Sequence, residues 1–240
     1  MKNPVKFGFM ALALACVTPA FAAEEVAAEE EEGAIGWTPI AIGLASPVQV
    51  PWGMARWDVF GLDLNLFYSD APKMYGLGIG GFAMTTRDDL YGWQISGLCN
   101  FNMKDVYGIR TTLGANIALG ETYGWDMGLF GYRTGEMRGI DTEFIGSYQQ
   151  ANFWGLQIAG IVNFSTAQTY GANIALGGNI SKIAYGLELG CLFNFTEELH
   201  GCQIGLVNYA RECPWGFQIG LVNIILDNKV KVLPIVNAYF

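Results

Sequence analysis

Apolar and polar positions alternate at period two within a repeated unit that fills most of the chain. Glycine opens each unit, and successive opening glycines are 15 or 16 residues apart. The residues on either side of the second position after the glycine are mostly apolar, as in Leu156 and Ile158. This alternation indicates β-strands with two different faces, and the regular period predicts a repeat architecture. The opening glycines are Gly61, Gly76, Gly92, Gly108, Gly124, Gly139, Gly155, Gly171, Gly186, Gly201 and Gly216.

The second position after the glycine is polar in ten of the eleven units, with Gly78 as the exception. Because these residues recur at one position of a two-faced strand, they form a single polar row. The row is the main candidate for a functional site, and we expect it to face the interior. Its members are Asp63, Gln94, Arg110, Asp126, Asp141, Gln157, Asn173, Glu188, Gln203 and Gln218.

Aromatic residues and asparagine mark the two ends of most units. An aromatic residue such as Tyr75 usually precedes the glycine, and an asparagine such as Asn163 closes the strand, before a polar turn. The spacing from glycine to asparagine is seven or eight residues, which indicates a bulge inside some strands. A one-residue difference reverses the face, so the side on which asparagine lies stays open.

Two architectures fit these units, and the sequence favours an antiparallel up-and-down outer-membrane β-barrel of about 12 strands. Strands of ~10 residues match the ~25 Å apolar band of such barrels, and the aromatic residues would form two girdles. The glycines and the polar row would face the lumen. The alternative is a parallel β-solenoid with reversed faces, in which leucine and isoleucine fill the interior. Stacked Asp126 and Asp141 would repel each other in that arrangement.

The segments before the repeats have different compositions. Residues 1–22 read as a secretory signal peptide, with Lys2 and Lys6 before an apolar run and cleavage near Ala22. Residues 23–34 are an acidic leader expected to be disordered. Residues 35–53 are expected to be an irregular segment or a plug, with an extra strand also open. Residues 54–240 form the expected repeat β-barrel.

Charge and chemistry narrow the function. Removing Lys2 and Lys6 from the 13 basic residues leaves 11 against 22 acidic residues, a net charge near −11 that argues against nucleic-acid binding. His200 is the only histidine, and no catalytic, cofactor or metal-ligand motif occurs. We therefore expect no enzymatic activity, no cofactor and no metal.

The units GLQIAGIVN, GCQIGLVN and GFQIGLVN are similar to those of a bacterial surface-repeat family with G-L-Q-I-G-L-x-N motifs. The closing strand, with its terminal Phe240, resembles the last strand of bacterial outer-membrane barrel proteins. These resemblances imply a location in the bacterial outer membrane. They also imply that the barrel-assembly machinery binds the closing strand. They supply no catalytic residues.

Two functional hypotheses follow. The first is an outer-membrane barrel in contact with lipid, with a structural or passive pore-like role. The second is a surface-exposed solenoid that acts as an interaction or adhesion module. The sequence leaves the oligomeric state open.

Overall fold

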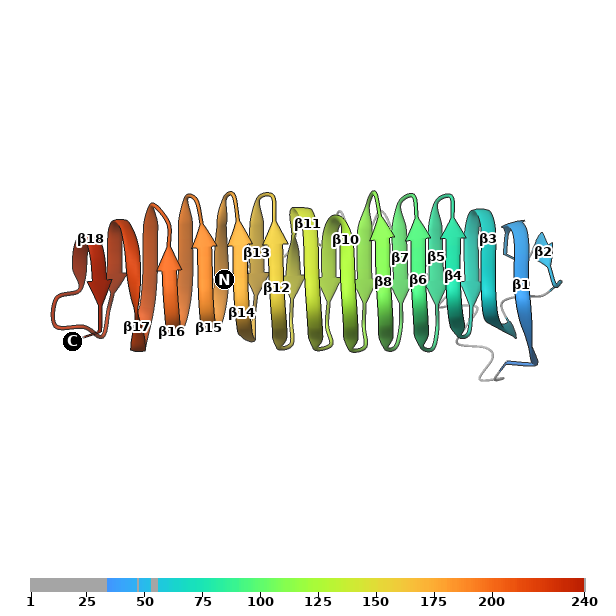
Figure 1. Ribbon diagram of the computed structural model, residues 1–240, viewed down its shortest axis with the longest axis horizontal. Coiled ribbons are helices and arrows are strands. Elements are labelled where there is room, and N and C mark those ends of the chain that lie inside the picture. The colour runs from blue at the N-terminus through green and yellow to red at the C-terminus, as the bar shows by residue number, and fades with distance from the viewer. Residues whose placement is uncertain (1–33, 47, 53–55, 240) are drawn as a thin grey trace, which may run out of the picture.

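The computed structural model is a parallel β-solenoid of about 10 turns, so the expectation of an antiparallel barrel is wrong and the alternative is confirmed (Figure 1). The structure describes residues 34–46, 48–52 and 56–239. The signal peptide, nearly all of the acidic leader and Phe240 lie outside these residues. Pairing between consecutive coils is parallel, as in Gly76 opposite Gly92.

Each coil consists of a long segment that contains the opening glycine and a short segment that contains the closing asparagine. In several coils the two segments are separate strands. These strands are β4 (Met74–Gly80), β5 (Ala83–Thr86), β6 (Leu90–Ser96), β7 (Cys99–Asn102), β8 (Val106–Thr112), β9 (Ala115–Ala118), β12 (Phe153–Ala159), β13 (Val162–Ser165) and β14 (Gln168–Ala175).

Elsewhere the segments continue into each other without a break. These longer strands are β3 (Trp57–Ala71), β10 (Thr122–Arg133), β11 (Met137–Gln149), β15 (Gly178–Gly190), β16 (Phe193–Ile204) and β17 (Val207–Ile225). The described part of the chain therefore has more strands than the twelve expected, because one repeat unit contributes two segments instead of one.

Antiparallel strands close both ends of the stack. At the first end, β1 (Gly36–Ala45) pairs in parallel with β3, and β2 (Val48–Val50) pairs antiparallel with β1. Among the readings left open for residues 35–53, these two strands favour the extra strand over an irregular segment or plug. At the other end, β18 (Val232–Ala238) pairs antiparallel with β17. These strands cover the open edges to which another chain could otherwise add a strand.

The opening glycines form a corner of the coil, which corrects the expectation that they face inward. Their φ angles lie between +124° and +153°, a region that only glycine adopts readily. A Cβ on Gly139 would lie 1.9 Å from the carbonyl oxygen of Gly124 in the preceding coil. A side chain there would therefore point along the solenoid axis, and close coil-to-coil stacking requires glycine.

The polar side chains lie inside the solenoid and most of the large apolar ones lie outside. The expectation that a solenoid reverses the faces is therefore wrong. The interior contains one mainly apolar column, two residues before the glycine in most coils and three before Gly216 in the last, and several polar columns. The buried apolar members of that column are Val59, Met74, Leu90, Val106, Met137, Phe153, Ala184, Leu199 and Cys213.

The closing asparagines also point inward, which resolves the face that the sequence left open. A turn at one edge of the coil separates glycine and asparagine, and that turn accommodates the difference of one residue. Asn208 donates hydrogen bonds to Oδ1 of Asn223 at 2.8 Å and to the carbonyl of Ile219 at 2.8 Å. Asn100, Asn163, Asn179 and Asn194 make the same two kinds of hydrogen bond, so these asparagines link their short segments both to the next asparagine and to a long segment.

We predict that Gly139→Ala lowers the free energy of unfolding by about 3 kcal/mol or more, because the left-handed backbone and the neighbouring carbonyl both oppose a Cβ. Ile158→Ala, which shortens an outward side chain, should cost about 1 kcal/mol. Denaturant unfolding monitored by circular dichroism measures both values. Equal losses in the two variants would contradict the role of the glycine corner.

Candidate interaction surface

The ten residues of the polar row all lie in the solenoid interior, at most 4% exposed. They make hydrogen bonds with one another and with the short segments, and they line no barrel lumen. Gln218 Nε2, for example, donates to Gln203 Oε1 at 2.8 Å. Because the side chains are buried in this way, the row is unavailable to a ligand and acts as part of the core.

Two arginines neutralise the stacked aspartates at the centre of the solenoid. Arg110 forms a bidentate ion pair with Asp126. Arg133 donates to Asp126 Oδ2 at 2.8 Å and to both oxygens of Asp141, at 2.7 and 2.9 Å. Asp126 does lie in register with Asp141, as the argument against a solenoid assumed. Arg133 bridges the two carboxylates, so the expected repulsion is offset.

The same cluster contains Glu143, whose carboxylate lies 3.4 Å from Nη2 of Arg133. Burial and the neighbouring Asp141 raise the pKa of Glu143 well above its usual range. The pKa of Asp126 is lowered despite its burial, because both arginines favour the charged form. Three acids and two arginines therefore reach charge balance when Glu143 holds a proton.

Elsewhere in the interior, buried acids depend on hydroxyl and amide donors. Glu188 accepts hydrogen bonds from Ser181 at 2.5 Å, from Thr196 at 2.5 Å and from Gln203 at 2.8 Å. Burial raises its pKa, and these donors oppose the rise. Burial likewise raises the pKa of Asp63 to about 6.

The outer surface of the long segments is a continuous apolar sheet, here named the apolar face. Its only polar side chains besides Cys202 are Thr111 and Thr142. Their hydroxyls accept hydrogen bonds from the indole N–H of Trp93 at 3.2 Å and of Trp125 at 3.3 Å. The members are Leu62, Leu64, Leu77, Ile79, Trp93, Ile95, Ile109, Thr111, Trp125, Met127, Ile140, Thr142, Leu156, Ile158, Ala172, Ile174, Leu187, Leu189, Cys202, Ile204, Phe217 and Ile219.

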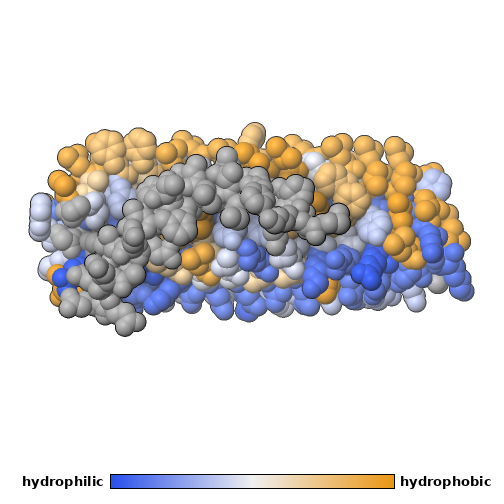
Figure 2. Space-filling model, turned by 180° about the vertical axis from the view of Figure 1, so that it is seen from behind, coloured by the Kyte–Doolittle hydropathy of each residue, from blue (hydrophilic) through white to orange (hydrophobic). Residues whose placement is uncertain are grey.

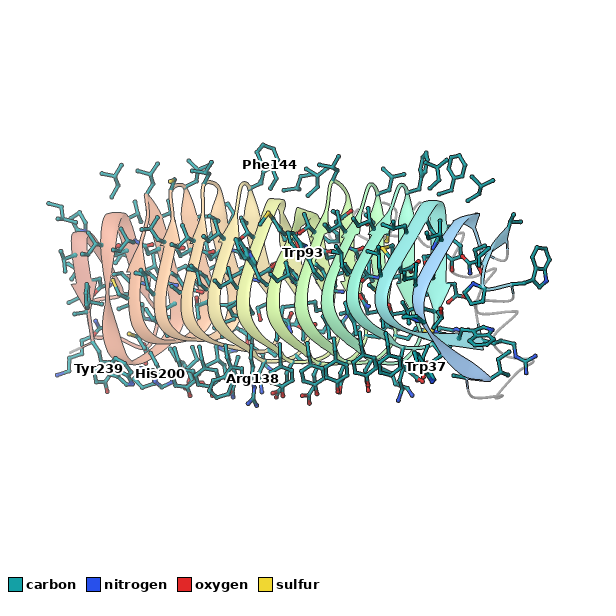
Figure 3. The ribbon with its side chains drawn as sticks, turned by 45° about the vertical axis from the view of Figure 1, so that its right-hand side comes forward. Trp37, Trp93, Arg138, Phe144, His200 and Tyr239 are labelled. Carbon is teal, nitrogen blue, oxygen red and sulfur yellow. The ribbon has the colours of Figure 1, made fainter. Side chains whose placement is uncertain are left out.

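A row of exposed apolar side chains, here named the apolar ridge, occupies the turns between long and short segments. Figure 2 shows this hydrophobic edge along the top of the molecule, and Figure 3 places Phe144 on it. Exposure ranges from 39% at Leu129 to 78% at Leu113. The members are Leu66, Phe82, Leu98, Leu113, Leu129, Phe144, Ile161, Leu176, Leu192, Leu206 and Leu221.

The residues before the glycines form an aromatic ladder at the opposite edge. Tyr91 stacks on Tyr107 with ring centroids 4.7 Å apart and planes 8° from parallel. Arg138 replaces a ring in the ladder, and its guanidinium carbon lies 5.6 Å from the ring centroids of both Tyr123 and Trp154. His200 is also a member of the ladder. The members are Phe60, Tyr75, Tyr91, Tyr107, Tyr123, Arg138, Trp154, Tyr170, Tyr185, His200 and Trp215.

Charged side chains occur only in the interior and in the polar turns beside the aromatic ladder, within the part of the chain that the structure describes. These turns form the charged edge, seen as the hydrophilic lower side in Figure 2. Ten acids and nine bases nearly cancel there. They are Asp58, Asp88, Asp89, Asp105, Glu121, Glu136, Glu197, Glu198, Glu212 and Asp227, with Arg56, Lys73, Arg87, Lys104, Arg138, Lys182, Arg211, Lys229 and Lys231.

Other kinds of site are not evident in the described ranges. Cys191, Cys202 and Cys213 are free thiols in this part of the chain. No group of three or more metal-ligating side chains is placed to hold a metal ion. The same residues include no helix that is long and apolar enough to cross a membrane.

Comparison with known proteins finds no matching family model, no similar curated protein and no similar solved structure. The molecule's own geometry therefore carries the functional argument.

Sequence reasoning missed Arg133 and the apolar ridge. Arg133 lies outside the second position that defines the polar row, on the short segment of its coil. It follows Gly131, which stands where other units have asparagine, and the pattern predicts a turn after that position. A leucine or phenylalanine recurs near the middle of each unit, and that signal could have identified the ridge.

Arg133→Met should lower the free energy of unfolding by about 3–5 kcal/mol, because it leaves Asp126 and Asp141 buried with too little positive charge. The matched control is Arg138→Met, which removes an exposed guanidinium from the aromatic ladder and should cost about 1 kcal/mol or less. Denaturant titration at neutral pH compares the two variants. A loss at Arg133 no larger than that at Arg138 would refute the bridging role.

Asp63 should make stability fall as the pH rises from about 4 to about 6. Its folded-state pKa of about 6 exceeds the ordinary 3.8, so the folded state holds the proton over this interval and the unfolded state does not. Relative to Asp63→Asn, the wild-type unfolding free energy should decrease by about 2 kcal/mol between pH 4 and pH 7. A difference between the two proteins that is independent of pH would contradict this prediction.

Proposed function

We propose that the protein is an exported interaction module of the cell envelope, a β-solenoid that presents an uncharged apolar exterior to its partner. The observation that carries the proposal is the distribution of side chains. The polar row is enclosed in the core and the other charged side chains are mostly confined to the charged edge, while the apolar face and the apolar ridge are on the outside. Contiguous apolar patches larger than a few hundred Å² are uncommon on soluble monomers and mark interaction sites.

The shape of the apolar face supports this function. Parallel pairing in register keeps equivalent side chains aligned from coil to coil, as with Leu156, Ala172 and Leu187. The buried hydrogen bonds behind the face hold the segments in place, so the surface needs little rearrangement on binding. A surface organised in advance loses less conformational entropy when a partner binds.

The signal-like segment at residues 1–22 supports export, although it lies outside the described residues. The enclosed polar row gives no support to the passive pore, because its side chains are buried and form hydrogen bonds with other interior side chains. The interaction module remains the hypothesis that accounts for the exposed apolar surface.

The test is binding of the chain from residue 23, the form expected after signal cleavage, to methyl-terminated and hydroxyl-terminated alkanethiol monolayers. We expect surface plasmon resonance to show binding to the methyl surface only. Combining Leu156→Gln, Ile174→Gln and Leu189→Gln should weaken that binding about tenfold or more, since each apolar side chain buried contributes about 1.5–3 kcal/mol.

The matched control combines Lys182→Gln, Glu197→Gln and Arg211→Gln, three exposed positions on the charged edge of the same coils. It should bind the methyl surface as the wild type does. Equal affinity for the two monolayers, or equal binding by the two triple variants, would refute the proposed function.

A further inference from the structure

The exterior changes in a fixed order from one edge of the solenoid to the other. The apolar ridge is followed by the apolar face, then by the aromatic ladder, and finally by the charged edge. Figure 3 shows this order, with Phe144 at one edge, Trp93 on the face, and Arg138 and His200 at the opposite edge. A lipid leaflet presents hydrocarbon, an interface favoured by tyrosine and tryptophan, and water in the same order.

The dimensions of the coil also fit a leaflet. Six or seven residues separate each member of the aromatic ladder from the ridge residue of its coil, as from Tyr91 to Leu98. At ~3.3 Å per residue this segment is ~20 Å long. The hydrocarbon half-thickness of a bilayer is ~15 Å. A ridge placed in the acyl chains would therefore leave the aromatic ladder near the headgroups.

Many backbone amides of the ridge already have hydrogen-bond partners and therefore do not need water. A turn exposed to lipid is normally unfavourable, because its amide and carbonyl groups lose water without replacement. Here ridge amides donate to the preceding coil, as Leu98 does to Phe82 at 2.7 Å and Leu192 does to Gly177 at 2.9 Å. The same bonding occurs at Phe82, Leu129, Ile161, Leu176 and Leu206.

The flanks of the coil are compatible with the same environment. The apolar face has no charged side chain, and its two indole N–H groups at Trp93 and Trp125 are bonded to threonine hydroxyls. On the other side, the short segments carry mostly apolar residues at the positions that alternate with the inward ones. These are Phe101, Tyr132, Phe164, Ile180, Phe195, Tyr209 and Ile224, while Ile117 and Tyr148 at the same positions are buried in an apolar cluster.

A second copy of the chain fits the ridge less well than lipid. Stable protein interfaces use roughly 20–30 residues on each side. The ridge supplies eleven residues in single file, and two convex ridges meet only along a line. Fluid acyl chains adapt to a convex row of leucine and phenylalanine side chains. The charged edge, with nearly equal acids and bases, adds little repulsion toward an anionic leaflet.

From this order we infer that the partner of the proposed interaction module is the hydrocarbon of a lipid leaflet, which the solenoid enters edge-on with the apolar ridge first. The solenoid axis then lies parallel to the membrane plane. The aromatic ladder lies at the interface and the charged edge stays in water. This inference rests on the proposed function and specifies its partner.

The experiment uses phosphatidylcholine vesicles and the chain from residue 23 carrying an environment-sensitive nitrobenzoxadiazole label. The exposed thiol of Cys191, beside Leu192 of the ridge, is labelled in a Cys202→Ala background, since Cys99 and Cys213 are buried. We expect vesicles to shift its emission to the blue, and lipids brominated deep in the acyl chain to quench it. A label at Lys182→Cys, with Cys191→Ala and Cys202→Ala, reports on the charged edge and should not change.

Flotation with the vesicles adds a quantitative measure. Combining Leu113→Gln, Phe144→Gln and Leu176→Gln on the ridge should lower partitioning at least tenfold. The charged-edge control with Lys182→Gln, Glu197→Gln and Arg211→Gln should partition like the wild type. Circular dichroism and unfolding of each variant establish that the fold is retained.

The other outcomes separate the two proposals. Binding to the methyl monolayer without binding to vesicles would overturn the lipid inference and leave the interaction module standing, with sedimentation showing whether a second copy is the partner. Binding to neither would overturn both. Quenching of the charged-edge label, or unchanged partitioning of the ridge variant, would overturn the edge-on orientation.

Discussion

The structure depends on one requirement: polar side chains in a dry interior need hydrogen-bond partners. Each coil must therefore supply partners for the next. A buried polar group without a partner costs about 1–3 kcal/mol, and a buried charge costs more. Stacked coils meet this requirement by repetition, because Asn194 finds Asn208 at the same position one coil later, 2.8 Å away. The period of 15 or 16 residues is therefore a consequence of the core. The stacked asparagines are 14 to 16 residues apart, and the coil absorbs these differences so that the amides stay in register.

The central coils show how the requirement is met when the repeat changes. The asparagine column is interrupted where Gly131 and Ser147 stand between Asn116 and Asn163. The space at Gly131 is taken by Arg133 and Glu143, since a Cβ there would lie 2.7 Å from Nη1 of Arg133. Loss of the amide and gain of the ion-pair cluster thus occur at one place. Such departures from the repeat are informative because they mark coils in which ion pairs replace the amide hydrogen bonds of the core.

The sequence was sufficient for the β-repeat and for the inward direction of the polar row, because alternation at period two defines the faces of a strand. The sequence did not determine which strands pair with each other or in which direction. The same alternation is compatible with an antiparallel barrel and with a parallel coil. The preference for a barrel over the solenoid rests on the premise that a solenoid core must be apolar. Arg133 removes the electrostatic objection at Asp126 and Asp141, and inward polar residues such as Asn100 and Asn102 give the coil a second segment that faces the core. Both facts are contacts between coils, which a single unit does not reveal.

A polar core also determines what the exterior must do. Apolar burial normally provides most of the favourable free energy of folding, and here the interior has only one mainly apolar column. Part of the compensation lies outside, where rings such as Tyr170 and Tyr185 stack 4.7 Å apart along the axis. The apolar ridge has no equivalent cover, because its side chains project from turns. Because the alternating pattern directs amides into the core, it leaves leucine and phenylalanine at the surface. A hydrocarbon partner would bury these side chains, which the fold itself leaves exposed.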